Sequence, residues 1–60
     1  MLLISAFSTK NNAIIEYYTN RVIFGNSAIE FKVIDFEGVG GYYASIPFKY
    51  VKSIVDADNA

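Results

Sequence analysis

The sequence predicts a small α+β domain that is mainly β: an antiparallel meander of four or five strands followed by one short carboxy-terminal helix. Apolar and polar residues alternate with a period of two over much of the chain before Pro47, which is typical of strands with one buried face. Gly, Asn and Ser interrupt the alternation where turns are needed. After Pro47 the apolar spacing lengthens to that of an amphipathic helix. Residues 1–60 are expected to form one domain, because so short a chain has room for only one core.

Two strands joined by a turn are expected at the start of the chain. Leu2 to Phe7 is a short apolar run, as in a buried strand, and the polar block 8–12 consists of turn-forming residues. Ala13 to Thr19 is the second expected strand. One of its faces carries Ala13, Ile15 and Tyr17, and the opposite face carries Ile14, Glu16 and Tyr18.

A third short strand, Val22 to Phe24, is expected after a turn at residues 20–21. The alternative is one long strand from Tyr17 to Phe24 with a bulge at the position of this turn. The Gly-Asn pair at residues 25–26 then predicts a hairpin, because both residue types tolerate a positive φ.

Ala28 to Glu37 is expected to be the central and longest strand, around which the others are organised. Apolar side chains alternate with charged ones up to Val33, and from Ile34 they alternate in the opposite phase. One extra residue between the two, a β-bulge, would return all five apolar side chains to one face. Residues 38–41 contain three glycines and predict a second hairpin.

Two structures compete for the end of the chain. Tyr42 to Ile46 alternate as a last strand, which Pro47 ends because proline cannot donate to a ladder. Polar residues at i, i+3, i+4 and i+7 then define one side of a helix over residues 47–55, and apolar residues fill the other side. The alternative is one turn ending at Tyr50, followed by a strand to Val55, as in small SH3-like barrels.

The reactive side chains predict that the protein is not an enzyme and holds no cofactor or metal. Cys and His are both absent, which removes disulfides, the usual zinc ligands and the commonest groups for covalent and acid–base catalysis. Asp35 and Glu37 could form a carboxylate pair, but alternation within a strand favours solvent-facing positions. The glycines of residues 38–41 precede an expected strand rather than a helix, which favours a turn over a phosphate-binding loop.

The charge balance disfavours nucleic acid as a partner. Five Lys and Arg against six Asp and Glu give a net charge of −1, so no positive field extends from the protein. The first residues lack the positive charge of a signal peptide, and no apolar run approaches the roughly 20 residues that cross a bilayer. A cytoplasmic protein without a membrane partner is expected.

The apolar content predicts a protein partner or self-association as a homo-oligomer. Apolar residues make up 53% of the chain and aromatic residues 17%, more than so small a core can enclose. In the pairs Tyr17-Tyr18 and Tyr42-Tyr43, one ring of each pair must face inward and one outward. The alternation assigns Tyr17 and Tyr42 to the core. The sequence therefore predicts a non-enzymatic protein–protein interaction module, a small regulator or inhibitor that binds through an aromatic sheet face or edge. Its predicted partner-binding residues are Ile14, Tyr18, Lys32 and Tyr43.

A small β-barrel that binds RNA or single-stranded nucleic acid is the alternative function. Bases would stack on Tyr18 and Tyr43, and phosphates would contact the nearby cations. These cations are Arg21, Lys32, Lys49 and Lys52.

Two short comparisons with known families belong to this alternative. M-L-L-I-S at the start and I-E-F-K-V-I-D-F-E-G in the middle resemble the carbon-storage-regulator RNA-binding family, and F-K-Y-V-K-S-I-V resembles the end of Sm-like small barrels. The spacing of the first two segments is longer than in that family, and its basic residues are missing. The amino-terminal helix of Sm-like barrels is lacking too. The second resemblance implies an Sm-like small β-barrel, which stands beside the SH3-like barrel described above as the alternative fold. Neither resemblance carries a function over.

Overall fold

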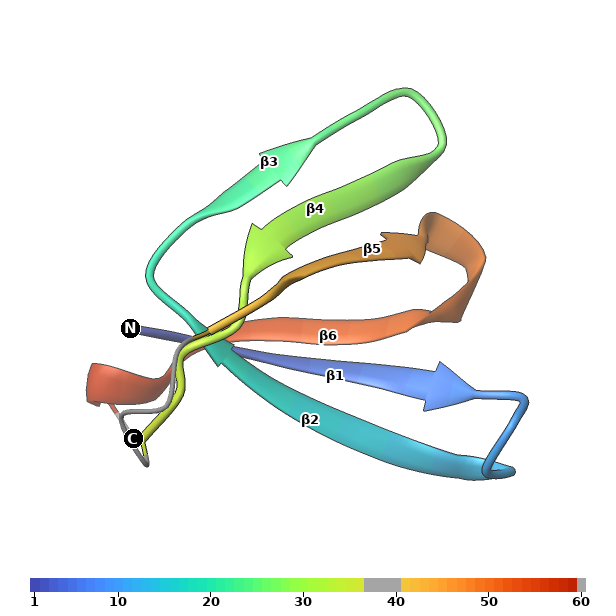
Figure 1. Cartoon of the computed structure of the whole chain (residues 1–60), viewed down its shortest axis with the longest axis horizontal. Coiled ribbons are helices and arrows are strands. Elements are labelled where there is room, and N and C mark those ends of the chain that lie inside the picture. Colours follow the sequence, from blue (N-terminus) through green and yellow to red (C-terminus); the bar gives the residue numbers. More distant parts are fainter. Residues whose placement is uncertain (37–40, 60) are drawn as a thin grey trace.

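The computed structural model describes residues 1–36 and 41–59, and in these residues the fold is mainly β, with two three-stranded antiparallel sheets (Figure 1). Sheet A has the strand order β2-β1-β6, and sheet B has the order β3-β4-β5. The described residues thus form six strands rather than four or five. The strands of sheet A are β1 (Leu2–Ser8), β2 (Ala13–Thr19) and β6 (Val51–Asp56); those of sheet B are β3 (Val22–Phe24), β4 (Ala28–Lys32) and β5 (Tyr43–Pro47). Two 3₁₀ turns, η1 (Phe48–Tyr50) and η2 (Ala57–Asn59), follow β5 and β6.

The predicted helix over residues 47–55 is wrong, and the alternative of one turn followed by a strand is correct. Phe48–Tyr50 form a single 3₁₀ turn, and β6 then pairs antiparallel with β1. Half of the residues of β6 are β-branched, which favours the extended conformation. Pairing with β1 also supplies hydrogen-bond partners along the new strand.

A β-bulge explains why the sequence of β6 imitates a helix. Val51 pairs with Ala6, and the next residue with a partner is Ser53, so Lys52 is an extra residue in the ladder. The bulge brings Val51 and Ile54 to the inner face, where both pack against the core. Apolar residues spaced three apart in a sequence are typical of a helix. The bulge therefore produced the helix-like spacing that led to the wrong prediction.

The predicted central strand is shorter than expected. β4 ends at Lys32, and Glu37 lies outside the described residues. The proposed bulge does not return every apolar side chain to one face, because Phe36 is 66% exposed.

The change of phase in the sequence marks a change of partner rather than a bulge. The Val33 N–H donates to the carbonyl of Tyr42, just before β5, at 2.8 Å. The next residue, Ile34, donates its N–H to the carbonyl of Tyr18 in β2, also at 2.8 Å. Consecutive residues thus bond to opposite sheets, and this passage resets the alternation.

Thr19 fixes the corner between the two sheets. β2 and β3 lie in different sheets, so the alternative of one long strand from Tyr17 to Phe24 is wrong. The Thr19 hydroxyl is buried and donates to the carbonyl oxygens of Lys32 at 2.8 Å and Arg21 at 3.0 Å, between which its single hydrogen is shared. This side chain therefore links the end of β2 to the start of β3 and the end of β4.

The core lies between the two sheets. Ile4 and Ala6 from β1 and Ile29 and Phe31 from β4 are at most 4% exposed. Phe31 contacts the ring of Tyr17 edge to face, with 5.5 Å between centroids, which confirms the predicted inward position of Tyr17. Half-buried side chains complete the core, namely Val22, Val33, Ala44, Ile46, Val51 and Ile54.

Two predicted turns are confirmed, and one predicted core residue is wrong. A turn occupies residues 9–12, and the Gly25 N–H closes the next hairpin on the carbonyl of Ala28 at 2.9 Å. Most of the predicted glycine hairpin lies in residues 37–40, outside the described part. Tyr42 is 59% exposed instead of buried, because the chain paired with it leaves sheet B directly after Val33.

The two ends of the described chain are joined. The Ala57 N–H donates to the carbonyl of Met1 at 3.0 Å, and the Met1 amino group pairs with the carboxylate of Asp58. The hydrogen bond to the Asp58 carboxylate raises the pKa of the Met1 amino group above its ordinary value.

Candidate functional site

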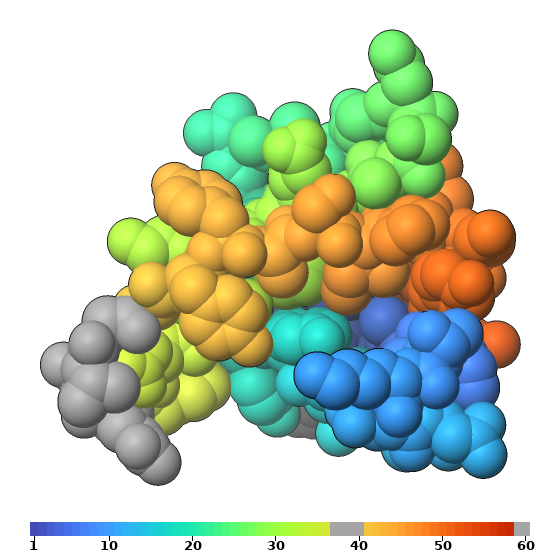
Figure 2. All heavy atoms as spheres, turned by 45° about the vertical axis from the view of Figure 1, so that its right-hand side comes forward, coloured from blue at the N-terminus to red at the C-terminus, as the bar shows by residue number. Residues whose placement is uncertain are grey.

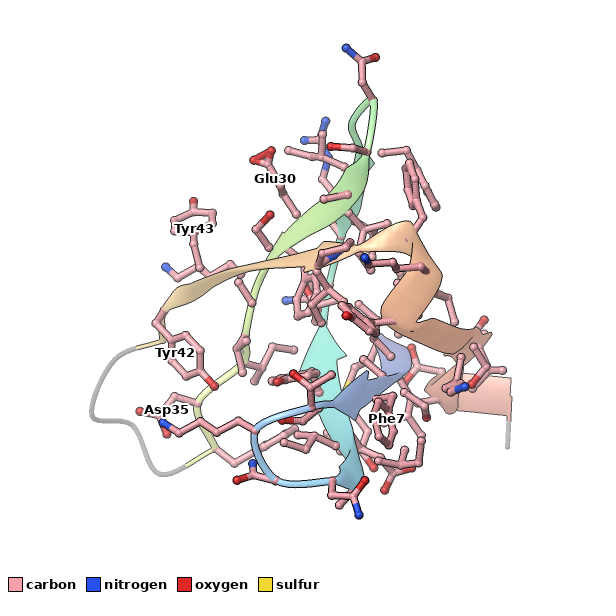
Figure 3. All side chains as sticks on the ribbon, turned by 90° about the vertical axis from the view of Figure 1, so that its right-hand side faces the viewer. Phe7, Glu30, Asp35, Tyr42 and Tyr43 are labelled. Carbon is pink, nitrogen blue, oxygen red and sulfur yellow. The ribbon has the colours of Figure 1, made fainter. Side chains whose placement is uncertain are left out.

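The structure places the four predicted binding residues on two different surfaces. Ile14 and Tyr18 lie in β2 on the outer face of sheet A. Lys32 and Tyr43 are paired across β4 and β5 and lie on the outer face of sheet B. A single meander would bring all four together, whereas two sheets separate them. Figure 3 shows the division, with Tyr43 and Glu30 projecting from sheet B and Phe7 from sheet A.

The outer face of sheet A is largely apolar. Ile4 and Ala6 of β1 point into the core, so the residues between and beside them point outward. In register across β2 and β1, Ile14 lies opposite Phe7, Glu16 opposite Ser5 and Tyr18 opposite Leu3. Across β1 and β6, Leu3 lies opposite Val55 and Ser5 opposite Ser53. We call the following residues the apolar face: Leu3, Phe7, Ile14, Tyr18, Val55 and the adjoining Phe36.

An exposed aromatic pair stands at one end of the apolar face. The rings of Tyr18 and Phe36 meet edge to face, with 5.4 Å between centroids and 85° between planes. Tyr18 is 38% exposed and Phe36 66%, and across the face Ile14 and Val55 are each about half exposed. The sequence placed Phe36 with the core residues, so its position here was missed. The only signal was the change of phase after Val33.

Two opposite charges frame the apolar face. Glu16 projects from β2, between Ile14 and Tyr18. On the far side of β1, the bulge at Lys52 directs its ammonium group over the ring of Phe7, 5.9 Å from the centroid. Among the described residues neither Glu16 nor Lys52 takes part in an ion pair.

A cleft of about 640 Å³ opens beside the corner between β2 and β3. Arg21, Lys32 and Tyr43 line it, and Tyr43 is 78% exposed. The carboxylates of Glu30 and Asp35 line the same cleft. The Thr19 hydroxyl bonds to the backbone of both Arg21 and Lys32, so the main-chain positions that carry these two cations lie close together. The cleft therefore combines an aromatic wall with two positive and two negative groups.

A second, smaller cavity of about 210 Å³ lies between the β1–β2 turn and η1. Phe7, Tyr17, Pro47 and Tyr50 are among the residues that line it. Its volume is below that of typical cofactor pockets, roughly 300–1,000 Å³, so it fits a single side chain rather than a cofactor. Figure 2 shows β5, in orange, lying uncovered across the surface above this region.

The described part of the chain offers little for metal chemistry. In residues 1–36 and 41–59, no three side chains of His, Cys, Asp or Glu are grouped so as to hold a metal ion. Nor does this part contain a helix with the length and apolar character needed to span a membrane.

Comparisons with protein-family models, with curated proteins and with solved structures find no match to this chain.

Proposed function

We propose that the protein is a non-enzymatic protein–protein interaction module, a small regulator or inhibitor, and that it binds its partner through the apolar face of sheet A. Its fold is proposed to be a small barrel of the SH3-like kind, which the single 3₁₀ turn before the last strand supports. The absence of Cys and His supports a role in binding rather than catalysis.

The observation that carries the proposal is the exposed ring pair of Tyr18 and Phe36 beside Ile14 and Val55. Burying apolar surface contributes about 25 cal/mol per Å², and aromatic residues are enriched at the centres of interfaces. Here the two rings already contact one another edge to face. A partner that covers them therefore orders little additional side-chain freedom.

A photoreactive benzophenone side chain in place of Phe36 tests this proposal. We expect the full chain carrying it to form a covalent adduct with its partner on irradiation in the producing cells, measured by mass spectrometry. Phe24 provides a matched control, because it is 68% exposed but lies on β3 of sheet B. The same group at position 24 should yield little adduct. No adduct at position 36, or equal yields at both positions, would contradict the proposal.

A second candidate function is binding of single-stranded nucleic acid in the cleft. It is favoured by one observation: the main chains of Arg21 and Lys32 lie close together beside the exposed ring of Tyr43. Bases stack on such rings and phosphates contact such cations.

Titration with oligouridylate, followed by tyrosine fluorescence, tests this second candidate. Two phosphate contacts predict a slope of about −1.4 for the logarithm of affinity against the logarithm of salt concentration. Tyr43→Ser should abolish the fluorescence change, whereas Tyr18→Ser on the other sheet should preserve it. An affinity for oligouridylate that does not change with salt concentration, or that is lost in Tyr18→Ser instead, would exclude the cleft as a nucleic-acid site.

A further inference from the structure

We propose that the partner on the apolar face is a second copy of this chain, packed face to face about a two-fold axis that runs along β1. This inference rests on the proposed function, because it names the occupant of the same face. It is carried by the charges that frame the face: Glu16 on β2 and Lys52 on β6, one on each side of β1.

The two charges suit a symmetric pair. In a two-fold interface, a contact between two different residues forms twice. If the first residue of one copy contacts the second residue of the other copy, the second residue of the one copy also contacts the first residue of the other. Rotation about an axis along β1 lays β2 of one copy over β6 of the other. Glu16 then faces Lys52 of the second copy, and the same pair forms again on the other side. Since neither residue has an ion-pair partner among the described residues of its own chain, both are available for this contact.

The apolar residues fit the same operation. Tyr18 and Val55 lie on opposite sides of Leu3 in the same row. Tyr18 of one copy would therefore cover Val55 of the other. In the middle row of the face, Ser5 and Ser53 lie beside Glu16. These small side chains let two sheets approach at about 10 Å, the usual spacing of stacked sheets.

The competing two-fold arrangement is less favourable. An axis across the strands would lay β2 over β2, with Glu16 against Glu16 of the second copy. Like charges across an interface are repulsive, and Lys52 would gain no acidic neighbour to offset them. The charges therefore select the axis along β1.

The size of the face predicts a weak dimer. Three strands about 4.8 Å apart and about six residues long, at about 3.3 Å per residue, give roughly 280 Å² in projection. Stable interfaces typically bury about 800 Å² of accessible surface per partner. The dimer is therefore expected to dissociate on dilution.

Complementary charge reversal tests the inference. Glu16→Lys and Lys52→Glu are made separately in the full chain, and self-association is measured by equilibrium sedimentation at low salt. Each variant alone should associate roughly tenfold more weakly or worse, because both ion pairs become like-charge pairs. An equimolar mixture of the two should recover association, because a heterodimer restores both opposite-charge pairs.

A matched control and the opposing outcomes complete the test. Glu30→Lys makes the same change of charge on sheet B and should leave self-association unchanged. Unaltered circular dichroism shows that each variant is folded. A wild-type chain that stays monomeric at millimolar concentration, or a mixture that associates no better than its components, would overturn the dimer. A benzophenone adduct at position 36 with a different protein would refute the second copy and retain the interaction module, whereas no adduct at all would refute both.

Discussion

Phe31→Ala is expected to abolish the cooperative unfolding transition of this protein. Phe31 is 2% exposed, lies between the two sheets and contacts the ring of Tyr17. Removing such a side chain typically costs about 3–5 kcal/mol, from lost burial and from the cavity left behind. A chain of 60 residues has a free energy of unfolding of roughly 3–9 kcal/mol in total. Urea denaturation followed by far-ultraviolet circular dichroism measures the effect.

The chain supplies two controls for this prediction. Phe24 and Phe36 are 68% and 66% exposed, so Phe24→Ala and Phe36→Ala remove the same atoms from the surface and should barely move the urea midpoint. Phe31→Leu keeps most of the buried volume and should lower the midpoint without eliminating the transition. A Phe31→Ala protein that unfolds at the same midpoint as the two surface variants would show that the core lies elsewhere.

Alternation predicted correctly which side chains of a strand share a face. Ile29 and Phe31 are buried, and Glu30 and Lys32 between and after them are exposed, as a period of two requires. This pattern depends only on neighbouring residues along one strand. It could therefore be read without knowing which strands pair.

The errors arose where the local pattern depends on distant partners. At Lys52 a bulge against β1 changes the period and imitates a helix, and after Val33 the chain transfers its hydrogen bonds from one sheet to the other. Neither event leaves a local signal that separates it from its alternatives. Tyr42 was misplaced for the same reason, since the chain beside it leaves the sheet.

The candidate site was predicted in part. Ile14 and Tyr18 were expected on an uncovered face, and both are exposed there. The sequence could not reveal that Lys32 and Tyr43 belong to a different surface, because it gave no reason to divide the strands between two sheets. Phe36 was missed because its contact with Tyr18 depends on the crossing after Val33. The binding role of these residues stays a prediction.

Thr19→Val is expected to lower the free energy of unfolding by about 1–3 kcal/mol, although valine has nearly the same shape. The Thr19 side chain is 1% exposed, and its hydroxyl donates to the carbonyls of Lys32 and Arg21 while accepting a long contact of 3.4 Å from the Arg21 N–H. Valine would leave these partly buried backbone groups without that partner. Urea denaturation measures the loss, with Thr9→Val as the control, because Thr9 lies in an exposed turn.

Thr19→Val also tests whether the corner between the two sheets positions the proposed binding face. Next to Thr19, the carbonyl of Tyr18 accepts the N–H of Ile34, and Phe36 follows two residues later. Loosening the corner should therefore speed amide hydrogen exchange at Ile34 more than at Gly25, whose hydrogen bond closes a distant hairpin. Thr19→Ser keeps the hydroxyl and should retain slow exchange at Ile34 despite losing a methyl group. If Thr19→Ser and Thr19→Val accelerate exchange equally, packing of the methyl group rather than the shared hydrogen bond holds the crossing in place.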